Sequence, residues 1–147
     1  MTPARVVVEV SSTVRRLAIS RARAKQLVEA TLAEMKIRDA MVSVAFVGRT
    51  AMSRLNRDYL RHAGATDVIS FGMGREARGV PAVGDIYICP EIAARNARRA
   101  GVSQANELAR LVVHGTLHVA GLDHPHDASR VNSPMWRKQE RILGRID

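Results

Sequence analysis

The chain has 147 residues, which is about the length of one domain and enough to bury a single core. Its 23 lysines and arginines outnumber its 14 aspartates and glutamates, and the resulting formal net charge of +9 favours a polyanionic partner such as RNA or DNA. The single cysteine excludes an internal disulfide, and the short apolar start contains Glu9. We therefore expect a cytoplasmic protein without a signal peptide or a membrane helix.

The first part of the chain alternates between strand and helix patterns. Residues 5–10 are rich in β-branched side chains and predict a strand, after which a serine at 11 or 12 is predicted to cap a helix running to about residue 36. Alternating apolar residues predict a second strand at 41–47. Helical spacing of apolar residues then predicts a helix at about 50–60.

The middle of the chain predicts two more strands, at 67–73 and 85–89, separated by a glycine-containing loop. Pro90 suits the first turn of the next helix, and Gly101 suits its end. Strand patterns precede helix patterns overall, and no linker or repeat interrupts them. We therefore expect one α+β domain over residues 1–147, with a small mixed sheet of about four strands packed by helices.

The last part of the chain predicts two helices. Ser103 is expected to cap the first, which carries apolar residues on all sides and should therefore be central in the fold. Ser133 and Pro134 predict the start of the second helix, and Gly144 predicts its end.

Three histidines in the central helix and just after it have a spacing that predicts a metal site. His114 and His118 are four residues apart and project from the same helical face. Gly121 can adopt the left-handed conformation of a helix end, after which the chain can reverse and return His124 to the pair. Three nitrogen ligands favour zinc, or another divalent transition metal, and leave one position open for water, which zinc makes more acidic.

The spacing H-x-x-x-H-x-x-G-x-x-H is also that of the metzincin proteases, in which a glutamate follows the first histidine and acts as the general base. Here that residue is Gly115. The ligands of a zinc protease are thus present while its base is missing.

Further segments, spread over most of the chain, share a pattern with known proteins. They are Leu55-Asn56-Arg57-Asp58-Tyr59, Thr66-Asp67-Val68-Ile69-Ser70-Phe71, Gly84-Asp85-Ile86, Pro90-Glu91, Glu107-Leu108 and Gln139-Glu140, together with the motif H-G-x-L-H-x-x-G-x-D-H at 114–124. In combination they resemble the YbeY family of single-domain, metal-dependent endoribonucleases.

The resemblance implies a zincin-like site in which His114, His118 and His124 hold zinc. It further implies hydrolysis of RNA phosphodiester bonds in ribosomal RNA processing and in ribosome maturation or quality control. The expected partners are then ribosomal RNA and ribosomal subunits or assembly proteins, with neither DNA nor a membrane among them.

One departure from the family concerns the catalytic arginine. Many members have an arginine directly after the tyrosine that matches Tyr59, and the resemblance associates that arginine with the chemistry. This chain has Leu60 at that position. Arg61 is next along and is our candidate for the same task, although a shift of one residue turns a side chain by about 100° around a helix. The alternative is that Arg61 is an ordinary exposed arginine.

Two other functions remain open. The first is a metallohydrolase acting on amide bonds, which the metzincin-like spacing suggests. The second is a noncatalytic ribosome-assembly factor that binds RNA and uses its metal structurally. A structural zinc needs a fourth protein ligand, for which Asp123, His126 and Cys89 are candidates.

Two secondary features of the sequence bear on the site. Asp85 and Asp123 are candidates to accept a hydrogen bond from a histidine N–H and so to orient the ring. The few aromatic residues are scattered along the chain, so the sequence shows no platform on which unpaired bases could stack. We therefore expect recognition of the RNA backbone rather than of the bases.

Overall fold

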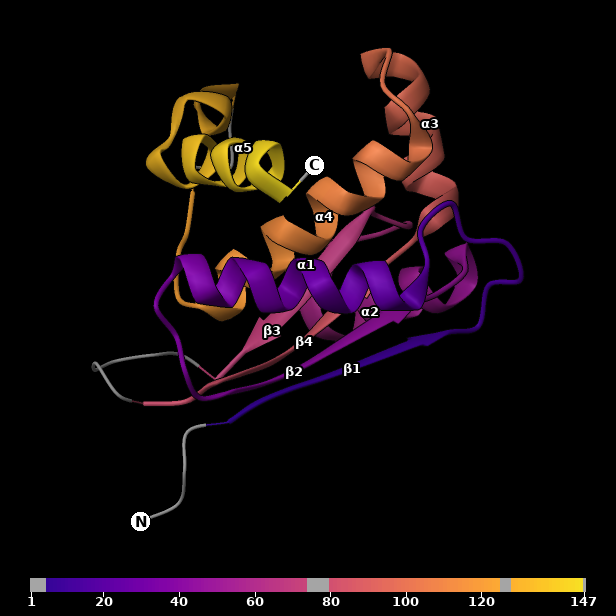
Figure 1. Ribbon diagram of the computed structural model, residues 1–147. Coiled ribbons are helices and arrows are strands. Elements are labelled where there is room, and N and C mark those ends of the chain that lie inside the picture. The colour runs from indigo at the N-terminus through magenta and orange to yellow at the C-terminus, as the bar shows by residue number, and fades with distance from the viewer. Residues whose placement is uncertain (1–4, 74–79, 125–127, 147) are drawn as a thin grey trace.

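A mixed β-sheet covered by helices forms the described part of the chain, which comprises residues 5–73, 80–124 and 128–146 of a computed structural model (Figure 1). The elements in chain order are β1 (Val6–Ser12), α1 (Arg21–Glu34), β2 (Ala40–Phe46), α2 (Arg49–Leu60), β3 (Val68–Gly72), β4 (Ala82–Ile88), α3 (Pro90–Ala100), α4 (Gln104–Val119), a 3-10 helix, η1 (Ala128–Asn132), and α5 (Pro134–Ile146). The strand order is β1-β2-β4-β3, in which only β3 runs antiparallel to its neighbour. The expected α+β class with a small mixed sheet is confirmed.

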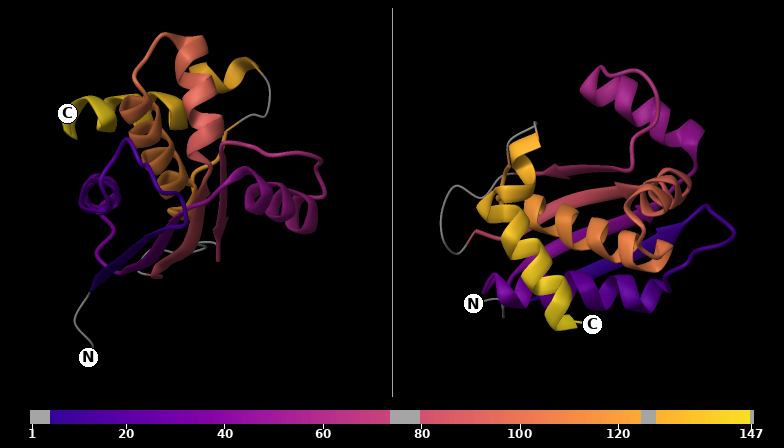
Figure 2. Two further views of the ribbon diagram at one scale, coloured as in Figure 1. Left: turned by 90° about the vertical axis from the view of Figure 1, so that its right-hand side faces the viewer. Right: turned by 90° about the horizontal axis from the view of Figure 1, so that it is seen from above.

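The strands alternate between two faces of the sheet, as their sequences predict. In β2 the side chains of Val42, Val44 and Phe46 are buried on one face, whereas Met41 is exposed on the other. Helices α1 and α4 pack on the first face, and Figure 2 shows α2 on the opposite side of the sheet. The main core therefore lies between the sheet and the pair α1 and α4.

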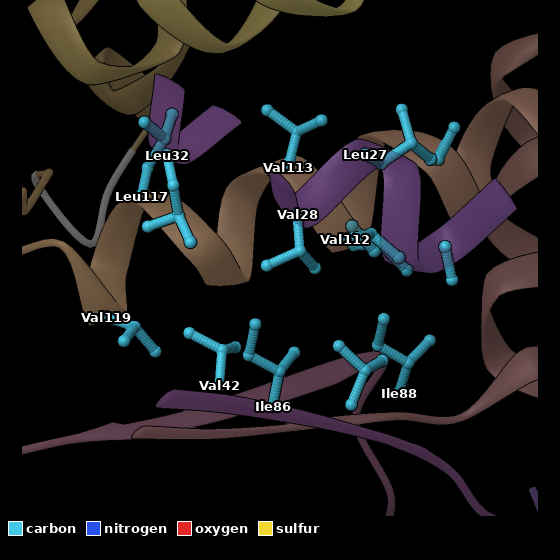
Figure 3. Close-up of a cluster of buried hydrophobic side chains, with 14 of the residues drawn as sticks. Leu27, Val28, Leu32, Val42, Ile86, Ile88, Val112, Val113, Leu117 and Val119 are labelled. Atoms are coloured by element: carbon cyan, nitrogen blue, oxygen red, sulfur yellow. The ribbon is translucent and has the colours of Figure 1, made fainter. Parts of the chain in front are cut away.

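Helix α4 is the centre of this core. It contacts α1, α3, α5, β3 and β4. Figure 3 shows Val112 and Leu117 of α4 among the side chains of α1 and of the strands, where both are fully buried. The expectation that this helix is central is confirmed, and the helix that carries two of the histidines is held on several sides.

Helix α4 approaches the sheet closely at Gly115. A methyl group placed there would lie 2.6 Å from Cγ2 of Ile86 in β4. Ile86 is β-branched and fully buried, so it cannot turn away easily. Glycine is therefore required at 115 by packing, because only a hydrogen atom fits between the helix and the strand.

The helix predicted to start at Ser11 or Ser12 begins later, at Arg21. Both serines continue β1, since Ser12 pairs with Phe46 of β2 and the next residue donates its backbone N–H to the Phe46 carbonyl at 3.0 Å. Ser20 is the actual N-cap, and its side chain accepts from the backbone N–H of Arg23. The sheet hydrogen bonds thus use the serines that the local sequence offered as caps.

The strand predicted at 85–89 begins earlier, at Ala82, and the first helix ends at Glu34 rather than at about residue 36. The predicted ends of the later helices agree with the structure, with one exception. Pro90 begins α3, Gly101 follows it with φ 70°, and the side chain of Ser103 caps α4. Helix α5 begins at Pro134 as predicted, but it continues past Gly144 to Ile146, because Gly144 does not take up the positive φ of a helix end. None of the described helices is long and apolar enough to cross a membrane.

We predict that Gly115→Ala lowers the free energy of unfolding by about 1–3 kcal/mol, because the added methyl group overpacks the contact with Ile86. Gly144→Ala is the matched control, since a methyl group there meets nothing within 4 Å. That control should be neutral or stabilising by up to about 1 kcal/mol. Denaturant titration of the two variants measures both values, and equal stabilities would contradict the packing argument.

Candidate metal centre

The three histidines of the motif come together in space. The ring centroids are 4.7 Å apart for His114 and His118, and 5.0 Å for each pair that includes His124. One ring nitrogen from each residue lies within 4.8 Å of the others. The group can therefore hold a metal ion.

The local fold brings His124 to the pair as the glycine predicts. Helix α4 ends at Val119, and Gly121 has φ 101°. The backbone N–H of Leu122 then donates to the carbonyl of Leu117 at 3.0 Å, which is the hydrogen bond of a glycine-terminated helix. The chain then reverses direction, so that the ring of His124 lies beside those of His114 and His118 of α4.

Burial makes the two helical histidines poor bases. It lowers the pKa of His118 to about 4, with further lowering by the neighbouring histidines and opposing effects from Asp123 and from a hydrogen bond to the backbone of Leu122. Burial also lowers the pKa of His114, against a hydrogen bond to Gln139 that raises it. Both rings are therefore neutral at neutral pH and keep a nitrogen lone pair for a metal. Such a donor set fits a divalent transition metal.

Two groups that the sequence did not suggest contact the rings of His114 and His118. Gln139 of α5 meets His114, with its Oε1 2.6 Å from Nδ1, and the backbone of Leu122 meets His118. Asp85 accepts from the hydroxyl of Ser43 at 2.6 Å on the sheet face away from α4, so its carboxylate does not reach the histidines. Asp123 accepts from the backbone N–H of His124.

Sequence reasoning did not assign Gln139 a role, although one signal was present. The residue lies on the buried face of an amphipathic helix, where a polar side chain requires a partner. The partner itself, 25 residues earlier, could not be read from the pattern.

Two of the candidates for a fourth protein ligand, Asp123 and Cys89, are not part of the group. Among the described residues, the cluster of possible metal ligands contains only the three histidines. Cys89 is buried in a separate apolar cluster with Val47 and Met52. His126 lies outside the described residues.

Arg61, the candidate for the catalytic arginine, lies at the end of α2. Arg61 is exposed and follows the last residue of α2, with a left-handed φ of 56°. Its side chain therefore does not continue the helical spacing that relates it to Leu60, which is 45% exposed. The charge of Arg130 in η1 contributes to the lowered pKa of His114.

Three of the aromatic residues that are scattered in sequence are neighbours in space. The rings of Tyr59 and Phe71 meet edge to face with centroids 5.3 Å apart, and those of Phe71 and Tyr87 meet at 6.0 Å. Tyr59 is 67% exposed. These residues, which are scattered along the sequence, therefore form a small aromatic cluster, because the turn after α2 and the pairing of β3 with β4 bring them together.

The fold and the site together define a small protein with a mixed sheet and a three-histidine centre on its central helix. A family model described as Endoribonuclease YbeY matches residues 9–147. The Endoribonuclease YbeY of Geobacter sulfurreducens is 32% identical over 143 residues, which are 95% of this chain and 95% of that protein. That of Beutenbergia cavernae is 41% identical over 107 residues, covering 67% of this chain and 71% of the relative.

A solved structure agrees with these sequence matches. The solution structure of TM1509 from Thermotoga maritima is similar over 95% of this chain and 89% of its own, with a TM-score of 0.63 and 26% sequence identity. The chain belongs to the YbeY family.

We predict that the purified chain binds a divalent transition metal and that His118→Ala weakens this binding by more than the roughly 10–100-fold loss typical of an outer partner, because one of three ligands is removed. His62→Ala is the control, since His62 is exposed and outside the group. Competition with a chromogenic chelator measures both affinities. Equal affinities in the two variants would exclude His118 as a ligand.

Proposed function

We propose that this chain is a zinc-dependent endoribonuclease that acts in ribosomal RNA processing and ribosome maturation or quality control, with a single catalytic domain over residues 1–147. His114, His118 and His124 are the proposed metal ligands. The observation that carries the proposal is the convergence of these three rings in a chain whose residues 9–147 match the endoribonuclease family model.

Zinc is proposed because of the donor set. Three imidazoles without a carboxylate suit zinc and related transition metals better than magnesium or calcium, which prefer oxygen ligands. When bound, the metal would supply Lewis acidity at a phosphate oxygen and a more acidic water. The burial of α4 supports this role, because ligands on a packed helix keep their positions.

The remaining task of the protein is to neutralise charge on the phosphate as it reacts. We propose Arg61 for this task, on the basis of its position next to the residue that replaces the family arginine. Arg130 is a second candidate, supported by the effect of its charge on His114. Either arginine suits this task, because a guanidinium group can donate two parallel hydrogen bonds to a phosphate.

RNA is the proposed substrate, with ribosomal RNA and ribosomal subunits or assembly proteins as partners in the cytoplasm. The relatives named above are endoribonucleases by name. The formal net charge of +9 supports binding to a polyanion. The charge does not distinguish RNA from DNA, and the name of the relatives specifies RNA.

Two alternatives are disfavoured by particular residues. Hydrolysis of amide bonds normally uses the glutamate that follows the first histidine, and position 115 packs against Ile86 with no space for a side chain. A noncatalytic role with a structural metal would require a fourth protein ligand, and the described residues offer three.

We predict that the zinc-loaded wild type cleaves ribosomal RNA and that His114→Ala reduces cleavage to the level of the chelator-treated wild type, because a metal ligand is lost. Cleavage is measured on defined RNA fragments, and product ends are sequenced to separate attack by water from attack by the ribose 2′-hydroxyl. His62→Ala should retain wild-type activity. Equal cleavage by wild type and His114→Ala would point to a contaminating nuclease and would contradict the proposal.

We predict that alanine at the arginine that contacts the phosphate lowers kcat by about 100-fold, as for the loss of one donor to developing charge. Arg61→Ala and Arg130→Ala are compared with Arg38→Ala, which removes an exposed arginine in the connection between α1 and β2. If Arg61→Ala matches the Arg38→Ala control, Arg61 has no catalytic role. If all three variants match wild type, the charge is neutralised elsewhere.

A further inference from the structure

Gln139 is a fully buried polar residue on the apolar face of α5, with 0% of its side chain exposed. Its Oε1 lies 2.6 Å from Nδ1 of His114, and its amide nitrogen donates to Oε2 of Glu140 at 3.0 Å. A buried amide is costly unless both of its ends form hydrogen bonds. Here both ends are used, and one of them is used by a proposed metal ligand.

Glu140 is held in turn by Arg110 of α4. Nε of Arg110 donates to Oε2 of Glu140 at 2.9 Å, and Nη2 donates to Oε1 at 3.0 Å, which is the two-point geometry of a guanidinium and a carboxylate. Nη1 also donates to Glu107 at 2.9 Å. The side chains of Arg110 and Glu107 are only 19% and 13% exposed, so water screens these contacts weakly.

The charge of Glu140 is stable at neutral pH. Burial by itself would raise the pKa of its carboxyl group, but hydrogen bonds from Arg110 and Gln139, together with the charge of Arg110, outweigh that effect and lower the pKa. Glu140 is therefore ionised and can only accept hydrogen bonds.

This acceptor fixes the orientation of the Gln139 amide. An ionised carboxylate requires the NH2 group on its side, so the carbonyl oxygen of Gln139 must face His114. A carbonyl oxygen can only accept, and Nδ1 of His114 must then be the protonated nitrogen. The lone pair of the ring is left on Nε2, the nitrogen that does not meet Gln139.

We propose that Gln139, oriented by the Arg110 and Glu140 ion pair, is a positioning residue that holds His114 in the tautomer protonated at Nδ1 and so keeps Nε2 available to the metal. The consequence for metal affinity rests on the proposed function. The tautomer of His114 does not depend on the proposed function, because it is a property of the metal-free chain. Without this contact the ring could rotate or carry its proton on the ligating nitrogen, and both changes would oppose metal binding.

The tautomer is measured by two-bond 1H–15N correlation spectra of metal-free protein labelled with 15N-histidine, at neutral pH. We expect the wild type to show His114 protonated at Nδ1. Gln139→Met keeps a side chain of similar size but removes the acceptor, and it should give a mixture of tautomers. Arg110→Met leaves every contact of His114 in place and should shift the population in the same direction by less.

Two controls separate this effect from general damage to the fold. Arg141→Met removes an exposed arginine from the same helix and should leave the spectra of His114 unchanged. The ring of His118, which bonds to the backbone of Leu122, should keep its tautomer in all of these variants. Thermal unfolding of each variant confirms that it is folded.

Metal affinity provides the second measurement. Chelator competition should show a loss of about 10–100-fold in zinc affinity for Gln139→Met and a smaller loss for Arg110→Met. Gln139→Glu should rescue most of the affinity, because a protonated carboxyl group can still donate to Glu140 and accept from His114. If Gln139→Met does not fold, Gln139→Glu and Arg110→Met carry the comparison.

The outcomes distinguish this inference from the proposed function. A wild-type His114 protonated at Nε2, or Gln139→Met with wild-type tautomer and affinity, would overturn the inference while leaving the endoribonuclease proposal intact. A wild type that binds no zinc would overturn the proposed function, and the spectra of the metal-free chain would still decide the role of Gln139.

Discussion

The contact between Gly115 of α4 and Ile86 of β4 is the constraint on which the rest of the structure depends. Because a single hydrogen atom separates helix and strand, α4 lies directly on the sheet and its other sides are covered by α1, α3 and α5. A methyl group at 115 would clash with Ile86, so the helix or the strand would have to shift. The position that carries a catalytic glutamate in metzincin proteases is used here for packing, so the two groups share a ligand spacing and differ in chemistry.

Burial of α4 also determines the state of the histidines. Desolvation penalises the charged imidazole, so His114 and His118 remain neutral and available as ligands. Nδ1 of His114 meets the side chain of Gln139, and the ring of His118 forms a hydrogen bond to the backbone of Leu122. These contacts limit the orientations of both rings. The packing that stabilises the domain thus also orients the histidine rings. The ion pair of Arg110 and Glu140 links α4 to α5 and holds Gln139 against His114.

Membership of the YbeY family explains the motif but not the departure at Leu60. In this chain the backbone at Arg61 is left-handed, and this changes the direction of the side chain relative to that of a residue inside α2. An arginine from η1, Arg130, lies close enough for its charge to affect His114. Arg61 at the end of α2 and Arg130 in η1 are therefore the two proposed sources of a cation for the substrate.

Local patterns in the sequence predicted most of the elements and the three-histidine group. The spacing of His114, His118 and Gly121 acts within one helix end, where nearby residues fix the geometry. The start of α1 could not be predicted, because sheet pairing at Ser12 removes a cap that local preference favours. The role of Gln139, like the meeting of the aromatic rings, depends on elements that pack only when the chain is folded. Hydrogen bonds between distant segments leave no periodic signal in the chain, so the tertiary structure alone decided how the ligands are oriented.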